Sequence, residues 1–190
     1  MFLSKIRNRE SGILIYGITP PKATTPYDRV CEIAAKSIGR LSGQDIDALI
    51  VYDVQDEAER TNAERPFPFS SSLDPLQYAQ QHLGALSVPK IIYRPASKFT
   101  SEELTSWLDE LKTLKAHPVF VGLPTPDYIP KTSLNQAYQL WRDNHMDHSV
   151  IGAVAIPERH AILKDEHVRM IDKMGNGVSY FVSQCVFDVD

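Results

Sequence analysis

The chain has 190 residues, of which 43% are apolar and 23% charged, with a formal net charge of −4. This is the composition of a globular protein, and the length suits one domain with a substantial core. The acidic balance argues against a generic binder of nucleic acid or anionic membranes. No apolar run is long enough to span a bilayer, and the N-terminus lacks the apolar core of a secretory signal. We therefore expect a cytoplasmic protein without nucleic-acid or membrane partners.

Six short runs rich in β-branched and aromatic residues recur along the chain and predict strands. Uninterrupted apolar runs of this kind are typical of strands buried on both faces, as in a parallel sheet covered by helices. The predicted strands are Ile13–Ile18, Ala48–Tyr52, Lys90–Tyr93, Pro118–Leu123, Val150–Ile156 and Ser179–Phe187.

Amphipathic segments with helix start signals lie between these runs. Thr25 before Pro26 predicts an N-cap with proline at the first helical position, and Asp74 before Pro75 repeats the pattern. Thr100 and Glu103 form a capping box. Further helices are predicted over Ser133–Asn144 and Lys164–Met174.

Five strand–helix units followed by a sixth strand predict an open doubly wound sheet or a (β/α) barrel. A (β/α)8 barrel usually needs about 250 residues. We therefore predict a single barrel-type domain over residues 1–190, with about six of the eight units and the last two missing. The segment 53–72 interrupts the rhythm, and it is either a functional loop or a solvated insertion.

Polar residues that follow the strands are the candidates for chemistry, because the carboxyl ends of the strands carry the active site of a barrel. The segment Ile156–His160, with the sequence IPERH, is either an anion- or cofactor-binding loop or a surface ion pair beside a histidine. Gln184 lies within the last apolar run and must find partners in the backbone or a ligand. The other candidates are Thr19, Asp53, Arg94, Thr125 and Asp188.

Other catalytic and metal-binding patterns are weak. His145 and His148 have a spacing that suits a metal only if it is helical, and they lie before the fifth strand, at the opposite end of the barrel. Cys31 and Cys185 have no histidine nearby in sequence, so nucleophilic catalysis is not expected. No Gly-x-Gly-x-x-Gly, P-loop or His-Glu-x-x-His motif occurs, which disfavours a Rossmann-type NAD site.

Several of these features together resemble the methylenetetrahydrofolate reductase family. They are Pro157-Glu158-Arg159-His160, then Lys173, then Ser183-Gln184 and Phe187-Asp188, together with the opening segment Gly12–Lys22 that contains Pro20-Pro21. The resemblance implies a (β/α)8 barrel that binds FAD and passes hydride from NAD(P)H to the methylene carbon of 5,10-methylenetetrahydrofolate, in one-carbon and methionine metabolism. It places Gln184 on the folate pterin. It places the flavin against Ile156, His160, Glu166, Arg169, Asp172 and Lys173.

The sequence also departs from that family. The family's proton-donating glutamate aligns with Gly17, so another acid, such as Asp53 or Asp127, would have to replace it. A positioned general acid typically contributes about 10²–10⁴ in rate. Lys90 stands near the family's flavin-side histidine, and Ile156 stands in place of a tyrosine. From these losses we expect weak FAD binding or none.

The sequence leaves three hypotheses for the function of the chain. The chain is a divergent flavin-dependent folate reductase, a folate-binding barrel that takes hydride directly from NADH, or a non-catalytic relative or fragment that acts as a binding or partner subunit. A homo-oligomer is compatible with each of them.

Overall fold

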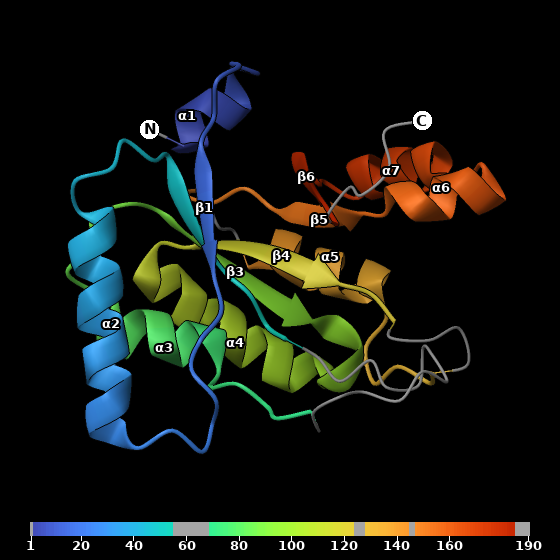
Figure 1. The fold of residues 1–190 in the computed structure, drawn as a ribbon. Helices are drawn as coiled ribbons and strands as arrows, with labels where there is room; N and C mark the ends of the chain where they lie inside the picture. Colours follow the sequence, from blue (N-terminus) through green and yellow to red (C-terminus); the bar gives the residue numbers. More distant parts are fainter. Residues whose placement is uncertain (1, 55–68, 124–127, 145–146, 185–190) are drawn as a thin grey trace.

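The computed structural model describes residues 2–54, 69–123, 128–144 and 147–184. Six parallel strands in chain order form one curled sheet with the shape of an open half-barrel (Figure 1). The strands are β1 (Ile15–Ile18), β2 (Ala48–Val51), β3 (Lys90–Pro95), β4 (His117–Val121), β5 (Gly152–Ala155) and β6 (Tyr180–Ser183).

Helices connect successive strands, as the sequence predicted. They are α2 (Tyr27–Leu41), α3 (Pro75–His82), the 3-10 helix η2 (Ala96–Lys98), α4 (Ser101–Leu114), α5 (Leu134–Asp143), α6 (Pro157–Leu163) and α7 (Glu166–Gly175). A further helix, α1 (Phe2–Arg7), precedes β1 and was not predicted. The predicted strand–helix alternation is therefore confirmed, whereas an eight-unit barrel is not shown.

Side chains cap the starts of α3, α4 and α5, whereas those of α2, α6 and α7 have no side-chain cap. Asp74 caps α3 by accepting hydrogen bonds from the backbone of Leu76 and Gln77, at 2.9 and 3.0 Å. Thr100 and Ser133 form complete capping boxes at α4 and α5. The predicted N-cap at Thr25 is wrong, because the N-cap of α2 is Pro26 and no side chain caps it.

Two apolar layers hold the sheet. The outer layer packs the sheet against α2 to α5 and contains the buried face of α4, with Leu104, Trp107, Leu108 and Leu111. The inner layer fills the concave face. Fully buried Phe2 belongs to this inner layer, where its ring packs 5.1 Å from His117 and 5.5 Å from Tyr180. Helix α1 thus covers part of the concave face.

The strands at the two edges differ from the buried strands that the sequence predicted. The middle strands β2 and β3 are buried at every position, whereas β1 has exposed residues at Tyr16 and Gly17, and no residue of β6 is buried. Because β1 and β6 stand at the ends of the sheet, each has only one strand neighbour among the described residues. The prediction of strands buried on both faces is therefore correct for the centre of the sheet and wrong for its edges.

Gly152 makes room for the half-buried ring of Tyr180 on the concave face. A Cβ added at Gly152 would lie 2.5 Å from Cζ of Tyr180, the residue paired with it on β6. The Tyr180 hydroxyl is itself buried, and burial raises the pKa of this phenol. Replacing Gly152 with alanine should therefore lower the free energy of unfolding by about 1–3 kcal/mol through overpacking.

Urea denaturation measures this effect, and Gly39→Ala is the matched control. A Cβ at Gly39, in α2, meets no atom within 4 Å, and the change should stabilise that helix by about 0.5–1 kcal/mol. Equal stability of Gly152→Ala and the unmodified chain would show that the Tyr180 ring can move aside without cost.

Candidate functional site: the carboxyl edge of the sheet

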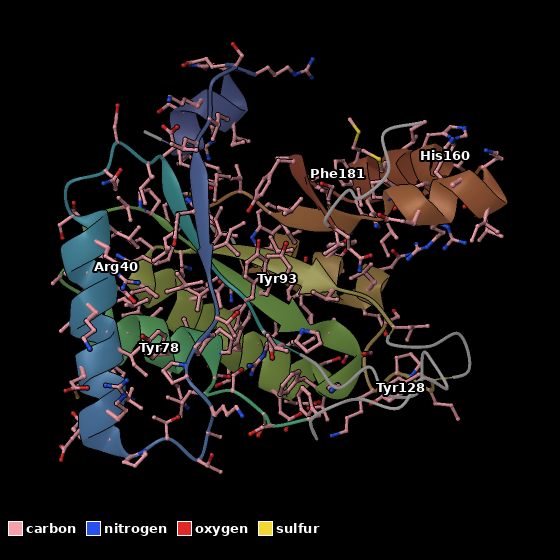
Figure 2. All side chains as sticks on the ribbon, in the orientation of Figure 1. Arg40, Tyr78, Tyr93, Tyr128, His160 and Phe181 are labelled. Carbon is pink, nitrogen blue, oxygen red and sulfur yellow. The ribbon has the colours of Figure 1, made fainter. Side chains whose placement is uncertain are left out.

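Aromatic rings line the concave face near the carboxyl ends of β1 to β3. Tyr52 directly follows β2, and its ring centroid lies 4.9 Å from that of Tyr93 in β3, in an edge-on arrangement. Tyr93 is nearly buried and lies over the middle of the sheet (Figure 2). Burial is the main cause that raises the pKa of the Tyr93 phenol. Tyr93 thus supports the half-buried ring of Tyr52 from its edge.

Gly17 faces the same surface, and the packing of Tyr52 explains why a glycine stands at this position. A Cβ at this position would lie 2.6 Å from Cε2 of Tyr52. A larger side chain at Gly17 and the observed position of the Tyr52 ring are therefore incompatible. The glycine at this position makes space for an aromatic ring, which the sequence alone did not reveal.

Gln184 stands at the opposite end of this edge, directly after β6. Gln184 follows Tyr180 and Val182 at every second position, and both of these residues contribute to the concave core. Its backbone N–H donates to the carbonyl of Ala155 at 3.0 Å. The side chain is exposed, and within the described part of the chain its carboxamide makes no hydrogen bond. Gln184 lies just after the strand and not within it, so of the two predicted partners, the backbone and a ligand, the ligand stays a prediction.

The remaining candidates at strand ends have mixed outcomes. Thr19 is exposed after β1, and Asp53 is half-buried after β2. Thr125, Asp127 and Asp188 lie outside the described residues. The role of Asp53 or Asp127 as a replacement acid stays a prediction.

The IPERH segment is a helix and not a loop. Pro157 to His160 form the first turn of α6, and the predicted single helix over Lys164–Met174 is in fact α7, which begins at Glu166. Proline at the first helical position favours this start, because its fixed φ suits a helix and its missing N–H has no partner there.

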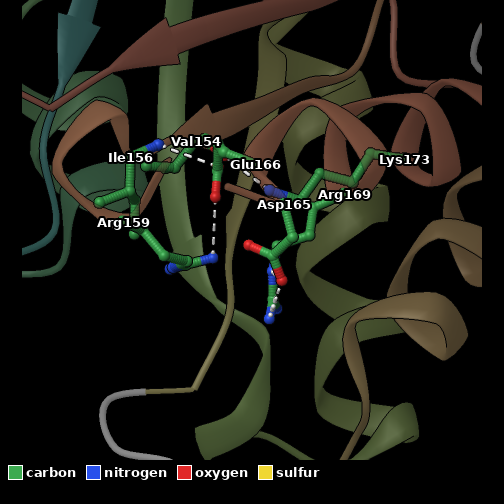
Figure 3. A network of polar contacts seen from close by, with 7 residues as sticks. All are labelled: Val154, Ile156, Arg159, Asp165, Glu166, Arg169 and Lys173. Carbon is green, nitrogen blue, oxygen red and sulfur yellow. Dashed lines mark hydrogen bonds and ion pairs between the residues drawn. The ribbon is translucent and has the colours of Figure 1, made fainter. Parts of the chain in front are cut away.

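Glu166 anchors this helix pair to the end of β5 (Figure 3). Its carboxylate is buried, with a side-chain exposure of 5%. One oxygen accepts a hydrogen bond from the backbone N–H of Ile156 at 2.9 Å, and the other accepts one from Arg159 at 3.2 Å. Both oxygens of this carboxylate are therefore used by the fold.

Two basic side chains of α7, Arg169 and Lys173, also have partners within the fold. Arg169 donates to Asp165 at 3.0 Å, and this bond raises the pKa of the guanidinium and lowers that of the carboxyl. Lys173 donates to the carbonyl of Val154 at 2.7 Å, and burial is the main cause that lowers its pKa. Figure 3 shows these contacts around the β5 end.

Two further residues of this region are less constrained. Asp172 is exposed on α7. The ring of His160 packs edge-on against that of His167 at 5.4 Å, and its Nδ1 is buried without a hydrogen bond to any described residue. The predicted flavin contacts therefore gather at one place, but most of their polar groups already serve the fold.

Two residues of β3, Arg94 and Lys90, lie away from the predicted site. Arg94 points into the helical layer, where it pairs with Asp74 at 2.5 Å and lies 3.8 Å above the ring of Phe99. Lys90 begins β3, at the amino end of the sheet, and its ammonium group donates to the carbonyl of Leu86. Neither residue faces the carboxyl edge of the concave face.

The metal and thiol candidates gain little support. No group of three or more potential metal ligands occurs among the described residues, and His145 lies outside them. Cys31 is free, and its sulfur lies 4.0 Å from Nδ1 of His82, a neighbour that sequence spacing could not show.

No helix in the part of the chain that the structure describes is both long and apolar enough to span a bilayer.

The fold of this chain is similar to that of several solved structures. No protein-family model and no curated protein matches the chain. Among solved structures, it is similar to oxaloacetate acetylhydrolase, with a TM-score of 0.60 and 9% identity over 98% of this chain and 63% of that one. It is similar to 2,3-dimethylmalate lyase, a member of the PEP mutase/isocitrate lyase superfamily, with a TM-score of 0.57 and 8% identity over 96% and 60%. At these identities the likeness concerns the fold alone.

Another solved structure is much more similar to this chain in sequence. An uncharacterized protein from Clostridium thermocellum, which binds two copies of 5-methyl-5,6,7,8-tetrahydrofolic acid, shares 39% identity with this chain at a TM-score of 0.83. The match covers 99% of this chain and 59% of that protein. The chain thus spans about three-fifths of the length of this folate-binding neighbour.

These findings correct the family assignment made from the sequence. The similar structures are a folate-binding protein and members of other (β/α) enzyme groups, and the methylenetetrahydrofolate reductase resemblance is wrong. The motifs that carried the resemblance are short, and one of them, Lys173, holds α7 to β5. Glu166, which the resemblance placed on the flavin, also holds α7 to β5, and Gly17, where the sequence departs from that family, accommodates Tyr52.

Proposed function

We propose that this chain is a folate-binding protein that holds a reduced folate at the carboxyl edge of its concave face, without a flavin. The observation that carries the proposal is the 39% identity to a protein that binds 5-methyl-5,6,7,8-tetrahydrofolic acid, over nearly the whole of this chain. In α/β folds, ligands bind outside the carboxyl ends of the strands.

The chemistry of this edge suits a pterin. The flat ring of a pterin stacks on an aromatic side chain, and Tyr52 supplies such a side chain at the end of β2. Its amide and amino edge presents paired donors and acceptors, which the carboxamide of Gln184 complements. The ring packing of Tyr93 and the absence of a side chain at Gly17 keep Tyr52 in place.

The contacts at the β5 end favour binding without flavin. Glu166, Arg169 and Lys173 are each engaged by a partner within the fold. A flavin bound there would have to replace those contacts. We therefore favour the non-catalytic or flavin-free alternative, and we assign neither a reductase activity nor a use of NAD(P)H.

The domain proposal follows from the same similarity. We propose that residues 1–190 form one domain, and that its six units belong to an eight-unit (β/α) barrel. Six parallel strands in chain order support this, together with coverage of only 59% to 63% of three similar structures.

Gln184→Ala tests the binding site directly. The change removes one or two hydrogen bonds to the pterin and should weaken binding of 5-methyltetrahydrofolate about 5- to 20-fold. Because the side chain is exposed, the melting temperature should change little. Gln80→Ala, at an exposed glutamine of α3, is the matched control and should bind like the unmodified chain.

Calorimetric titration of the three proteins measures the effect, with FAD as a second ligand expected to give no saturable heat. Unchanged folate affinity in Gln184→Ala would place the ligand elsewhere. Loss of affinity in Gln80→Ala of the same size would show a non-specific effect.

A further inference from the structure

A thiol and an imidazole meet between α2 and α3, in the helical layer outside the sheet. Cys31 is a partly buried residue of α2, and His82 lies in the last turn of α3. The sulfur of Cys31 lies 4.0 Å from Nδ1 of His82, within reach of a weak hydrogen bond. The two residues are 51 positions apart in sequence, so the packing of α2 beside α3 brings them together (Figure 1).

Tyr27 adds a third polar group at the same sulfur. It precedes Cys31 by about one helical turn, and a hydrogen bond between the two side chains is the main cause that raises the pKa of the Tyr27 phenol. Because this hydrogen bond favours the protonated phenol, the phenol O–H is the donor and the sulfur is the acceptor. The sulfur therefore has one neighbour that can take its proton and another that can stabilise its anion.

Two tyrosine rings hold the imidazole in place. The ring centroids of Tyr27 and Tyr78 lie 5.8 and 5.4 Å from that of His82. Tyr78 is buried, so the imidazole rests against a ring that is itself fixed by the outer core. The position of His82 next to Cys31 is thus determined by packing and not by the thiol contact alone.

The charged neighbours of this cluster come from α2. Asp28 directly follows Tyr27, and Arg29 is paired with Glu32. Helix α3, with the sequence PLQYAQQH, has no acidic or basic residue besides its histidine. A proton that leaves the Cys31 thiol toward α3 therefore has His82 as its acceptor.

A hollow beside the imidazole offers room for a second molecule. Its volume is about 170 Å³, and its walls include Tyr27, Tyr78 and His82, together with Gln77 and Gln81. Aromatic rings and carboxamides suit a small uncharged molecule that combines flat and polar parts. A molecule in this hollow lies next to the base of the Cys31 thiol.

We propose that Cys31 and His82 form a reactive thiol site, which exchanges with a small disulfide and retains one half of it as a mixed disulfide. His82 takes the thiol proton, and the Cys31 thiolate attacks one sulfur of the disulfide. The bond from Cys31 to that sulfur forms while the bond between the two disulfide sulfurs breaks. The other half leaves as a thiolate and takes the proton from His82. The disulfide is the only co-reactant that this exchange requires.

Reaction with 2,2′-dithiodipyridine tests the proposal, with Cys185→Ser in every protein so that a single thiol is observed. At pH 6 the chain with His82 intact should react at least about tenfold faster than His82→Asn, because a thiol without a base is mostly protonated at that pH. At pH 9, where both thiols are largely ionised, the two rates should agree within about threefold. Mass spectrometry should show one thiopyridyl group on Cys31.

Ser37 provides the matched control position. It is partly buried on the same helix, and its hydroxyl donates to the carbonyl of Ile33 at 3.0 Å. Cys31→Ser combined with Ser37→Cys moves the thiol along α2 and away from the His82 contact. The moved thiol should react at least about tenfold more slowly than Cys31 at pH 6. This comparison keeps His82 in place, so it decides the proposal even where His82→Asn does not fold.

Two results would overturn the proposal. One is an equal rate at pH 6 for the thiols at positions 31 and 37. The other is a His82→Asn rate that differs from that of the intact pair by the same factor at pH 6 and pH 9, because His82 would then affect only access to the sulfur. The cluster belongs to the outer layer and the proposed folate site to the concave face, so thiol exchange and folate binding can fail separately.

Discussion

Replacing Arg94 with methionine is expected to lower the free energy of unfolding by about 2–3 kcal/mol. Arg94 is 11% exposed at its side chain and pairs with Asp74, which also caps α3. Its guanidinium lies between the rings of Phe99 and Trp107, at 3.8 and 5.3 Å from their centroids. Removing one partner of a largely buried pair leaves the other charge without compensation and costs about 3–5 kcal/mol. The partial exposure of Asp74, 29%, reduces that figure.

The ion pair of Arg29 and Glu32 provides the comparison. Its side chains are 56% and 58% exposed, so Arg29→Met should cost less than about 1 kcal/mol. Both variants are measured by urea denaturation at neutral pH and moderate salt. Equal losses would show that the surroundings of Arg94 do not strengthen its interaction.

Lowering the pH from 6.5 to 4 is expected to destabilise the fold by about 3 kcal/mol through His117 alone. Burial is the main cause that lowers the pKa of His117, from 6.5 to about 4. Its Nδ1 accepts a hydrogen bond from the backbone N–H of Val150 at 3.3 Å, which requires the neutral ring. Above pH 6.5 both the folded and the unfolded state hold a neutral histidine, and stability is complete. Below it the unfolded state takes up the proton first, so stability falls until the folded pKa is reached.

His117→Asn isolates this contribution, because a carboxamide oxygen can still accept the Val150 hydrogen bond without titrating. Free energies of unfolding at several pH values between 7 and 4 give the slope. The variant should have a clearly smaller slope in this window, whatever its stability at pH 7. An unchanged slope would assign the pH dependence to other groups.

The alternation of strands and helices could be predicted from sequence because it depends on local patterns. Capping boxes at Thr100 and Ser133 and the cap at Asp74 each use residues within three positions of one another. Helix α1 escaped prediction because its apolar residues are few, and its place is fixed by the packing of Phe2 against His117 and Tyr180.

The candidate site was less accessible to sequence reasoning because its contacts join distant residues. Gln184 was found as a polar residue at a strand end, which is a local signal. The roles of Gly17 and Arg94 depend on Tyr52 and Asp74, which lie 35 and 20 residues away and are brought near only by the fold. The family was wrongly assigned for a related reason. Helix residues were expected to contact a flavin, whereas Glu166 and Lys173 hold α7 to the end of β5.

Calorimetric titration of the unmodified protein with 5-methyltetrahydrofolate tests whether this chain binds a reduced folate. We expect saturable binding that competes with other reduced folates. Absence of saturable heat up to about 1 mM ligand, which limits the binding free energy to weaker than about −4 kcal/mol, would contradict it.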